Sequence, residues 1–266
     1  MKVTSAKFLA AATLATIAAL GTANAADISM PAPAYRAPPP SGAYSWTGCY
    51  IGGGGGYGWW TQSSFVQFDG VAQTAVNTNG GSGWFGQGQG GCDYQFTTPI
   101  FNLPAVIGLF GDYAGGDIDG QSSFPPVFVG PERESAAWSV GGRFGILLTP
   151  RILSFFDGGW TQAHFDGVNY SIAIPGGAAT GLSLAAQTYN GWFLGSGFEY
   201  SLDWNWVPIR GLFLKTEYRY ARYGGDGVAV PLTGSVLGVP AIGAALNSQK
   251  STELVSTELV WRFNWH

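Results

Sequence analysis

Gly211-Leu-Phe-Leu-Lys-Thr-Glu-Tyr-Arg-Tyr220, close to the C-terminus, alternates two kinds of side chain. Leu212, Leu214, Tyr218 and Tyr220 occupy even-numbered positions, whereas Lys215, Glu217 and Arg219 occupy odd-numbered ones. Successive side chains of a β-strand point to opposite faces. The stretch therefore predicts a strand with one apolar, aromatic face and one face on which bases and acids alternate.

A second stretch, Glu253-Leu-Val-Ser-Thr-Glu-Leu-Val-Trp-Arg-Phe263, repeats this pattern. Leu259, Trp261 and Phe263 lie opposite Glu258 and Arg262. The polar face of a soluble sandwich meets water and needs no alternation of charge. The lumen of a narrow transmembrane barrel encloses that face, while the other face meets lipid. The two stretches together predict an outer-membrane barrel whose last strand ends near Phe263.

The N-terminus predicts export. Lys2 and Lys7 precede an apolar run over residues 8–20, and Ala23-Asn24-Ala25 matches a signal-peptidase site. We expect a signal peptide over residues 1–25, cleaved after Ala25. A proline-rich periplasmic leader then covers residues 26–43, and the barrel covers residues 44–266.

Composition favours a membrane barrel over a secreted, Gly-rich β domain, which is the alternative. Charged residues make up 11% of the chain, against about 25% in a typical soluble domain. The 42 Gly suit strands that curve around a small cylinder, and 11 Trp with 12 Tyr suit the two interfacial girdles. Cleavage after Ala25 removes two lysines and no acid, which changes the formal charge from −4 to −6. An acidic chain without a basic stripe is not expected to bind nucleic acid.

The fold class predicted is all-β, an eight-stranded antiparallel up-and-down transmembrane β-barrel. The expected strands cover residues 46–60, 82–97, 103–117, 135–148, 151–165, 187–202, 209–223 and 253–263. Short connections (98–102, 149–150 and 203–208) alternate with long ones (61–81, 118–134, 166–186 and 224–252). Outer-membrane barrels have short periplasmic turns and long extracellular loops. The long connections are therefore expected to face the outside of the cell.

Six blocks of sequence carry a resemblance to a known family. They are Trp46-Thr-Gly-Cys-Tyr-Ile-Gly-Gly, Ile107-Gly-Leu-Phe-Gly-Asp-Tyr113, Gly141-Gly-Arg-Phe-Gly145 with Leu148-Thr-Pro150, Gly158-Gly-Trp160, Gly191-Trp-Phe-Leu-Gly-Ser-Gly-Phe-Glu-Tyr200 and Leu214-Lys-Thr-Glu-Tyr-Arg-Tyr220. In this order they resemble the small alphaproteobacterial outer-membrane β-barrel proteins, the porin-like surface antigens, which share the architecture of the OmpA transmembrane domain. The resemblance covers essentially all of the mature chain and implies eight strands. Members are described as porins, structural proteins and surface antigens.

The chain departs from this family pattern in three places. Phe110 occupies a position that is usually acidic, which removes one interior charge. Asn264-Trp-His266 extends past Phe263, which matches the usual terminal aromatic residue. The chain also has two cysteines, whereas most members have none.

Parity along the expected strands places a set of charged side chains in the lumen. They are Asp112, Arg143, Asp157, Glu199, Lys215, Glu217, Arg219, Glu258 and Arg262. They could form a charged constriction that selects ions, or they could pair with one another and fill the lumen. The interior of an eight-stranded barrel is just wide enough for side chains to fill, which favours pairing. Arg143 is expected to pair with one or more of Glu199, Glu217 and Glu258.

Cys49 and Cys92 fall on neighbouring strands near the same rim, and parity points both toward lipid. The cell envelope is oxidising, so a disulfide is one expectation. The alternative is two small apolar side chains at a lipid surface, and the sequence leaves both open.

No constellation of residues predicts an enzyme, a cofactor or a metal. The glycines at 52–56 continue into a strand, unlike those of a phosphate-binding loop. Asp117-Ile-Asp119-Gly120 begins like a calcium loop but lacks the remaining ligands, so we interpret it as a polar loop apex. His164 and His266 are the only histidines, too few for a histidine-built zinc site. No nucleophile elbow is present.

The function expected is a non-enzymatic outer-membrane barrel with an envelope-structural or porin-like role. The alternative is a surface binding or adhesion protein that acts through its long loops, because residues 228–246 are unusually apolar for a solvated loop. Expected partners are outer-membrane lipid, the barrel-assembly machinery during biogenesis and, for the alternative, an extracellular ligand.

Overall fold

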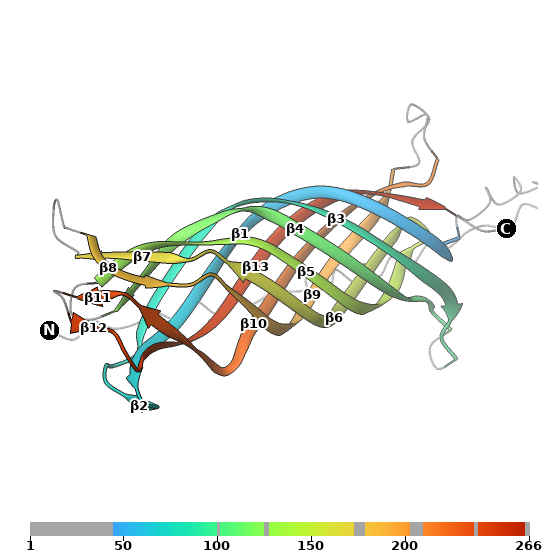
Figure 1. Cartoon of the computed structure of the whole chain (residues 1–266). Helices are drawn as coiled ribbons and strands as arrows, with labels where there is room; N and C mark the ends of the chain where they lie inside the picture. Colours follow the sequence, from blue (N-terminus) through green and yellow to red (C-terminus); the bar gives the residue numbers. More distant parts are fainter. Residues whose placement is uncertain are drawn as a thin grey trace, which may run out of the picture. The chain divides into compact units, whose positions relative to one another are not determined.

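Eight long antiparallel strands form a closed ring (Figure 1). They are β1 (Gly48–Phe68), β3 (Asn77–Thr97), β4 (Pro104–Phe124), β5 (Phe128–Thr149), β6 (Ile152–Phe165), β9 (Gln187–Ser201), β10 (Leu212–Thr233) and β13 (Ala244–Phe263). Each pairs with the next of the eight along the chain, and β13 pairs with β1 to close the ring. The prediction of an up-and-down barrel with eight ring strands is confirmed.

The computed structural model describes residues 45–99, 102–124, 128–172, 179–202, 210–236 and 239–263. The expected signal peptide and leader, the short turn at 203–208 and the residues after Phe263 lie outside them. Within the described residues, no helix is long and apolar enough to cross a membrane.

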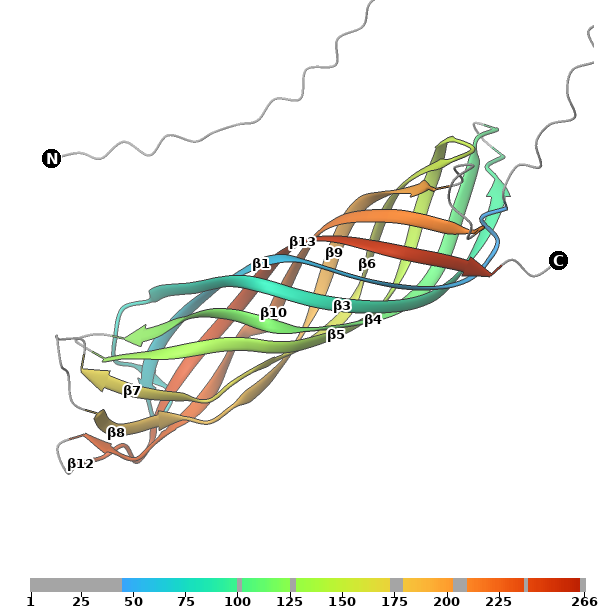
Figure 2. The same cartoon turned by 90° about the horizontal axis from the view of Figure 1, so that it is seen from above.

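Five short strands gather at one end of the ring, which lies on the left in Figures 1 and 2 and is here called the upper end. They are β2 (Val71–Ala72), β7 (Val168–Ile172), β8 (Ala179–Leu184), β11 (Ser235–Val236) and β12 (Val239–Pro240). The opposite, lower end carries the short connection between β5 and β6 and the end of β13.

The outward face of the ring has an apolar band. Its exposed side chains include Ile51, Leu109, Val140, Phe144, Phe156, Leu194, Phe198 and Leu259. Aromatic side chains mark its upper edge, namely Tyr57, Trp84, Tyr113, Trp138, Trp160, Trp192 and Tyr218. Exposure of 74% for Leu109 and 71% for Phe156 is costly in water but favourable in lipid. The band is the surface that meets the membrane.

The strands continue well above this band, and three of the four predicted long connections, at 61–81, 118–134 and 224–252, are shorter than expected. β1 extends to Phe68 and β4 to Phe124, whereas strands ending at residues 60 and 117 were expected. Outward residues above the band become polar, so the apolar stripe that identified the strands stops there. Backbone pairing nevertheless continues, because a second apolar core fills the interior of the upper end. Its members are Phe124, Val168, Tyr170, Leu182, Leu184, Val230, Leu232 and Leu246.

Three apolar side chains of the segment 228–246 belong to this core. Val230, Leu232 and Leu246 are 2%, 6% and 0% exposed. For these three side chains the interpretation as a solvated apolar loop open to a partner is wrong, because strand pairing turns them inward. Ile242 in the same segment is 80% exposed.

Candidate functional site

The lumen contains charged side chains in three layers, of which the lower one joins four strands. Arg143 on β5 donates to Asp93 on β3 through Nε at 2.8 Å and to Glu199 on β9 through Nη1 at 3.0 Å. Arg262 on β13 binds the same two carboxylates, with Nε 2.8 Å from Glu199 Oε1 and Nη1 2.6 Å from Asp93 Oδ2. All four side chains are at most 2% exposed. Two guanidinium groups thus share two carboxylates inside the barrel.

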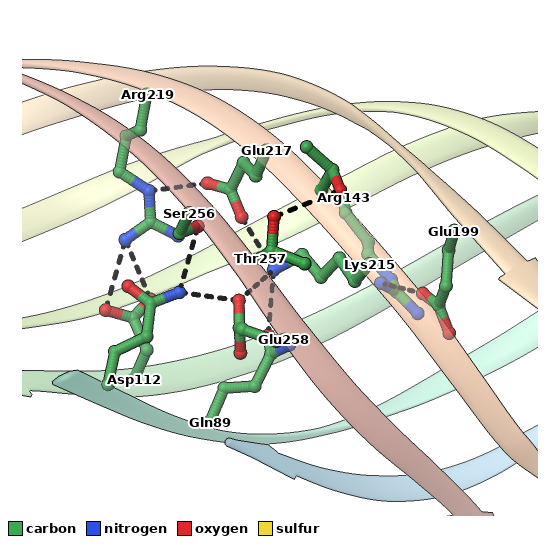
Figure 3. A network of polar contacts seen from close by, with 12 residues as sticks. Gln89, Asp112, Arg143, Glu199, Lys215, Glu217, Arg219, Ser256, Thr257 and Glu258 are labelled. Carbon is green, nitrogen blue, oxygen red and sulfur yellow. Dashed lines mark hydrogen bonds and ion pairs between the residues drawn. The ribbon is translucent and has the colours of Figure 1, made fainter. Parts of the chain in front are cut away.

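The middle layer centres on β10 (Figure 3). Arg219 lies 2.9 Å from Asp112 Oδ2 and 2.7 Å from Glu217 Oε1. Lys215 Nζ lies 2.6 Å from Glu217 Oε2 and 3.4 Å from Glu258 Oε1. Because side chains alternate along β10, Lys215, Glu217 and Arg219 lie one above another on its inward face. Glu217 is therefore paired with the cations two positions before and after it on the same strand.

The upper layer lies above the apolar band. Lys250 on β13 binds Glu132 on β5 at 2.6 Å and also donates to Gln62 on β1. Thr252 donates to Glu134 Oε2 at 2.9 Å. Sequence reasoning missed this layer because it assigned these positions to loops, although Glu132 and Glu134 alternate with outward Arg133 as strand residues do.

The structure places every predicted lumen charge inside the barrel. Some of the ion-pair partners differ from those expected from the sequence. Arg143 binds Glu199, one of its three expected partners. Glu217 and Glu258 bind Lys215 instead. Asp93 was missed, although its place between lipid-facing Cys92 and Tyr94 on β3 implies an inward side chain.

Asp157 is the exception to pairing. It is 6% exposed, and neither carboxylate oxygen has a hydrogen-bond partner among the described residues. Its neighbour across the β5–β6 ladder is Arg143, whose guanidinium instead binds Asp93 and Glu199.

Aromatic rings fill the space between the charges. Arg143 lies 4.6 Å from the Tyr50 ring centre, and Arg219 lies 4.4 Å from that of Phe193. Phe110 packs against Phe193 with ring centres 6.0 Å apart. A cation over an aromatic face is attracted by the ring quadrupole. The rings therefore stabilise the cations while excluding water.

In the layers described, the charged side chains are packed against one another and against the rings. Across the residues that the structure describes, no group of three or more His, Cys, Asp or Glu side chains is arranged to hold a metal ion. Chemically, the arrangement gives each lumen cation a carboxylate partner and ties strands together.

Cys49 and Cys92 are direct partners in the β1–β3 ladder. The structure joins them by a disulfide, with Cα atoms 3.9 Å apart. The bond lies on the outward face near the lower end and links the first two strands of the ring.

We expect this disulfide to be present in protein isolated from membranes. Maleimide labelling of unfolded, unreduced protein should then modify no thiol, and labelling after reduction should modify both cysteines. Labelling of two thiols without reduction would support the free-cysteine alternative.

Asp117 and Asp119 do not form a loop apex, and that interpretation was wrong. Both lie within β4, where the ladder with β5 continues past them. Asp117 binds Arg133 at 2.8 Å, and Arg133 also binds Asp166 at 2.6 Å. Partial burial raises the pKa of Asp166, but hydrogen bonds from Arg133 and Ser135 outweigh it, so this pKa lies below its ordinary value. Arg133 is thus held by two carboxylates on the outer surface above the band.

No protein-family model matches the chain. The 31 kDa outer-membrane immunogenic proteins of Brucella melitensis biotype 1 and Brucella suis biovar 1 are each 29% identical to it over 220 residues, which cover 79% of this chain and 86% of theirs. Among solved structures, the outer membrane protein OprG from Pseudomonas aeruginosa matches with a TM-score of 0.51 and 12% identity, over 83% of this chain and 99% of OprG. The first likeness extends over most of both sequences, and the second concerns the fold. With the apolar band and the closed ring, they identify the chain as a small β-barrel protein of the bacterial outer membrane that resembles the Brucella immunogenic proteins.

Proposed function

We propose that this barrel is a non-enzymatic, envelope-structural protein that does not conduct solutes. The observation that carries the proposal is the burial of the lumen cations, since Arg143, Lys215, Arg219 and Arg262 are at most 7% exposed and bound to carboxylates. A conducting constriction requires charges that face water. A buried cation, by contrast, is held by a carboxylate partner, because an unpaired buried charge costs several kcal/mol.

The upper end gives independent support. Its apolar core closes the interior above the band, with Val168 and Tyr170 only 1% and 2% exposed. A solute would have to displace this core and then three layers of side chains. The surface-binding alternative loses part of the apolar loop that favoured it, because Val230, Leu232 and Leu246 are buried.

Planar-bilayer recording tests this function. Refolded protein should give no stable conductance steps, while a general porin carried through the same preparation should give them. Reproducible steps that scale with salt would overturn the structural role and support the porin-like one.

A further inference from the structure

A row of three outward side chains crosses β6, β9 and β10 at the upper edge of the apolar band. Trp160 is the ladder partner of Trp192, and Trp192 is the ladder partner of Arg222. The strands of a barrel are tilted, so such a row climbs along the barrel axis. The row begins in the band at Val140, which is the ladder partner of Trp160. From Val140 to Arg222 the outward side chains change from aliphatic to indole to guanidinium.

The row lines a hollow on the outer surface. The hollow has a volume of about 450 Å³ and is lined by Trp160, Asn190, Gly191, Trp192, Arg222 and Gly225. Trp160 and Trp192 are 38% and 46% exposed. Gln162 donates to Asn190 Oδ1 at 2.8 Å, which leaves the amide N–H groups of Asn190 to donate elsewhere. The hollow therefore has two aromatic walls below and hydrogen-bond donors above.

Arg222 differs from the other outward arginine above the band. Arg133 is held by Asp117 and Asp166. Arg222 is exposed, and among the described side chains it has no ion pair or hydrogen bond. A guanidinium that faces solvent is a ready donor to a phosphate, which it binds through two parallel hydrogen bonds.

The position of the hollow limits what can occupy it. It continues the lipid-facing surface, and it lies at head-group depth, where aromatic girdles end. It belongs to the upper end, whose long hairpins are extracellular in outer-membrane barrels. An occupant must be lipid-attached, present a ring to the indoles and carry negative charge toward Arg222.

We propose that this hollow binds the phosphorylated sugar head group of an outer-leaflet glycolipid, with Arg222 and Asn190 on the phosphate and Trp160 and Trp192 against the sugar. The acyl chains then descend along the apolar band below. This assignment depends on the membrane location of the barrel and is independent of whether the lumen conducts.

The test compares Arg222→Gln with the control variant Arg133→Gln. Each variant loses one outward arginine at the upper end. Wild-type protein and both variants are refolded in detergent and titrated with bisphosphorylated lipid A, and bound lipid is counted by native mass spectrometry. Arg222→Gln should weaken binding roughly tenfold, as loss of a charge-assisted hydrogen bond does. Arg133→Gln should bind as the wild type does, and Arg222→Lys should retain part of the affinity.

Two further titrations identify the ligand chemistry. Dephosphorylated lipid A should bind the wild type as weakly as lipid A binds Arg222→Gln, and inorganic phosphate should not compete at equal concentration. Equal loss in both variants, equal binding of the dephosphorylated lipid, or effective competition by free phosphate would each overturn the assignment. Because all variants keep the lumen intact, these outcomes are separate from the conductance test.

Discussion

Replacement of Arg143 by methionine is expected to lower the free energy of unfolding of the barrel by about 3–5 kcal/mol, the usual effect of breaking a buried ion pair. Asp93 and Glu199 would then share Arg262 alone, with both carboxylates still buried at 0% exposure. Methionine preserves most of the apolar volume of the arginine stem, so packing loss contributes little. Urea unfolding in lipid vesicles, followed by tryptophan fluorescence, measures the change.

Two companion variants show whether charge is the cause. Arg151→Met removes an exposed arginine at the lower end and should change stability by less than about 0.5 kcal/mol. Adding Asp93→Asn to Arg143→Met should recover part of the loss, because one unpaired charge is removed. If Arg143→Met leaves stability unchanged but alters ion selectivity in bilayers, the lumen is an open constriction and the pairing account is wrong.

Gly54→Ala is expected to disrupt closure of the ring, with a loss of about 3 kcal/mol, the upper part of the range for overpacking. A Cβ atom at this position would clash with Thr257 O and lie 2.6 Å from the Glu258 Cα on β13. These are backbone atoms, so relief requires β1 and β13 to separate. The refolded fraction, read from the heat-dependent shift in gel mobility, should fall sharply.

Gly53→Ala is the matched control on the same strand. Its Cβ would meet nothing closer than Gln87 O at 3.7 Å, an ordinary contact. The adjacent glycine should therefore accept alanine with nearly unchanged refolding. Equal refolding of the two variants would contradict the close approach of β1 to β13.

Sequence reasoning placed the strands best where lipid covers them. The predicted strand at 151–165 and the observed β6, Ile152–Phe165, agree almost completely, because β6 ends where the apolar stripe ends. The strand predicted at 253–263 begins at Ala244 in the structure. In residues 244–252 the outward side chains Asn247, Gln249 and Ser251 are polar, and Leu246 and Lys250 point inward. The stripe that marks a membrane strand is therefore absent, while the ladder persists.

Inward or outward orientation follows from sequence, because it depends only on the period of two within one strand. That period is why Arg143, Glu199 and Lys215 were placed inside from sequence alone. The choice of ion-pair partners depends on how far each strand is staggered against its neighbours, and no single strand contains that information. Stagger brings Arg143 to Asp93, a residue 50 positions away, and leaves Asp157 without a described partner.

By itself, then, the sequence determined the strand period, the two faces of each strand and the outer-membrane address, since each is a local property of side-chain order. Tertiary structure alone decided the three lumen layers, the apolar core of the upper end and the row from Trp160 to Arg222. Each of these joins residues from strands far apart in the chain. Their alignment is fixed by the tilt and closure of the ring, which only the complete set of backbone ladders specifies.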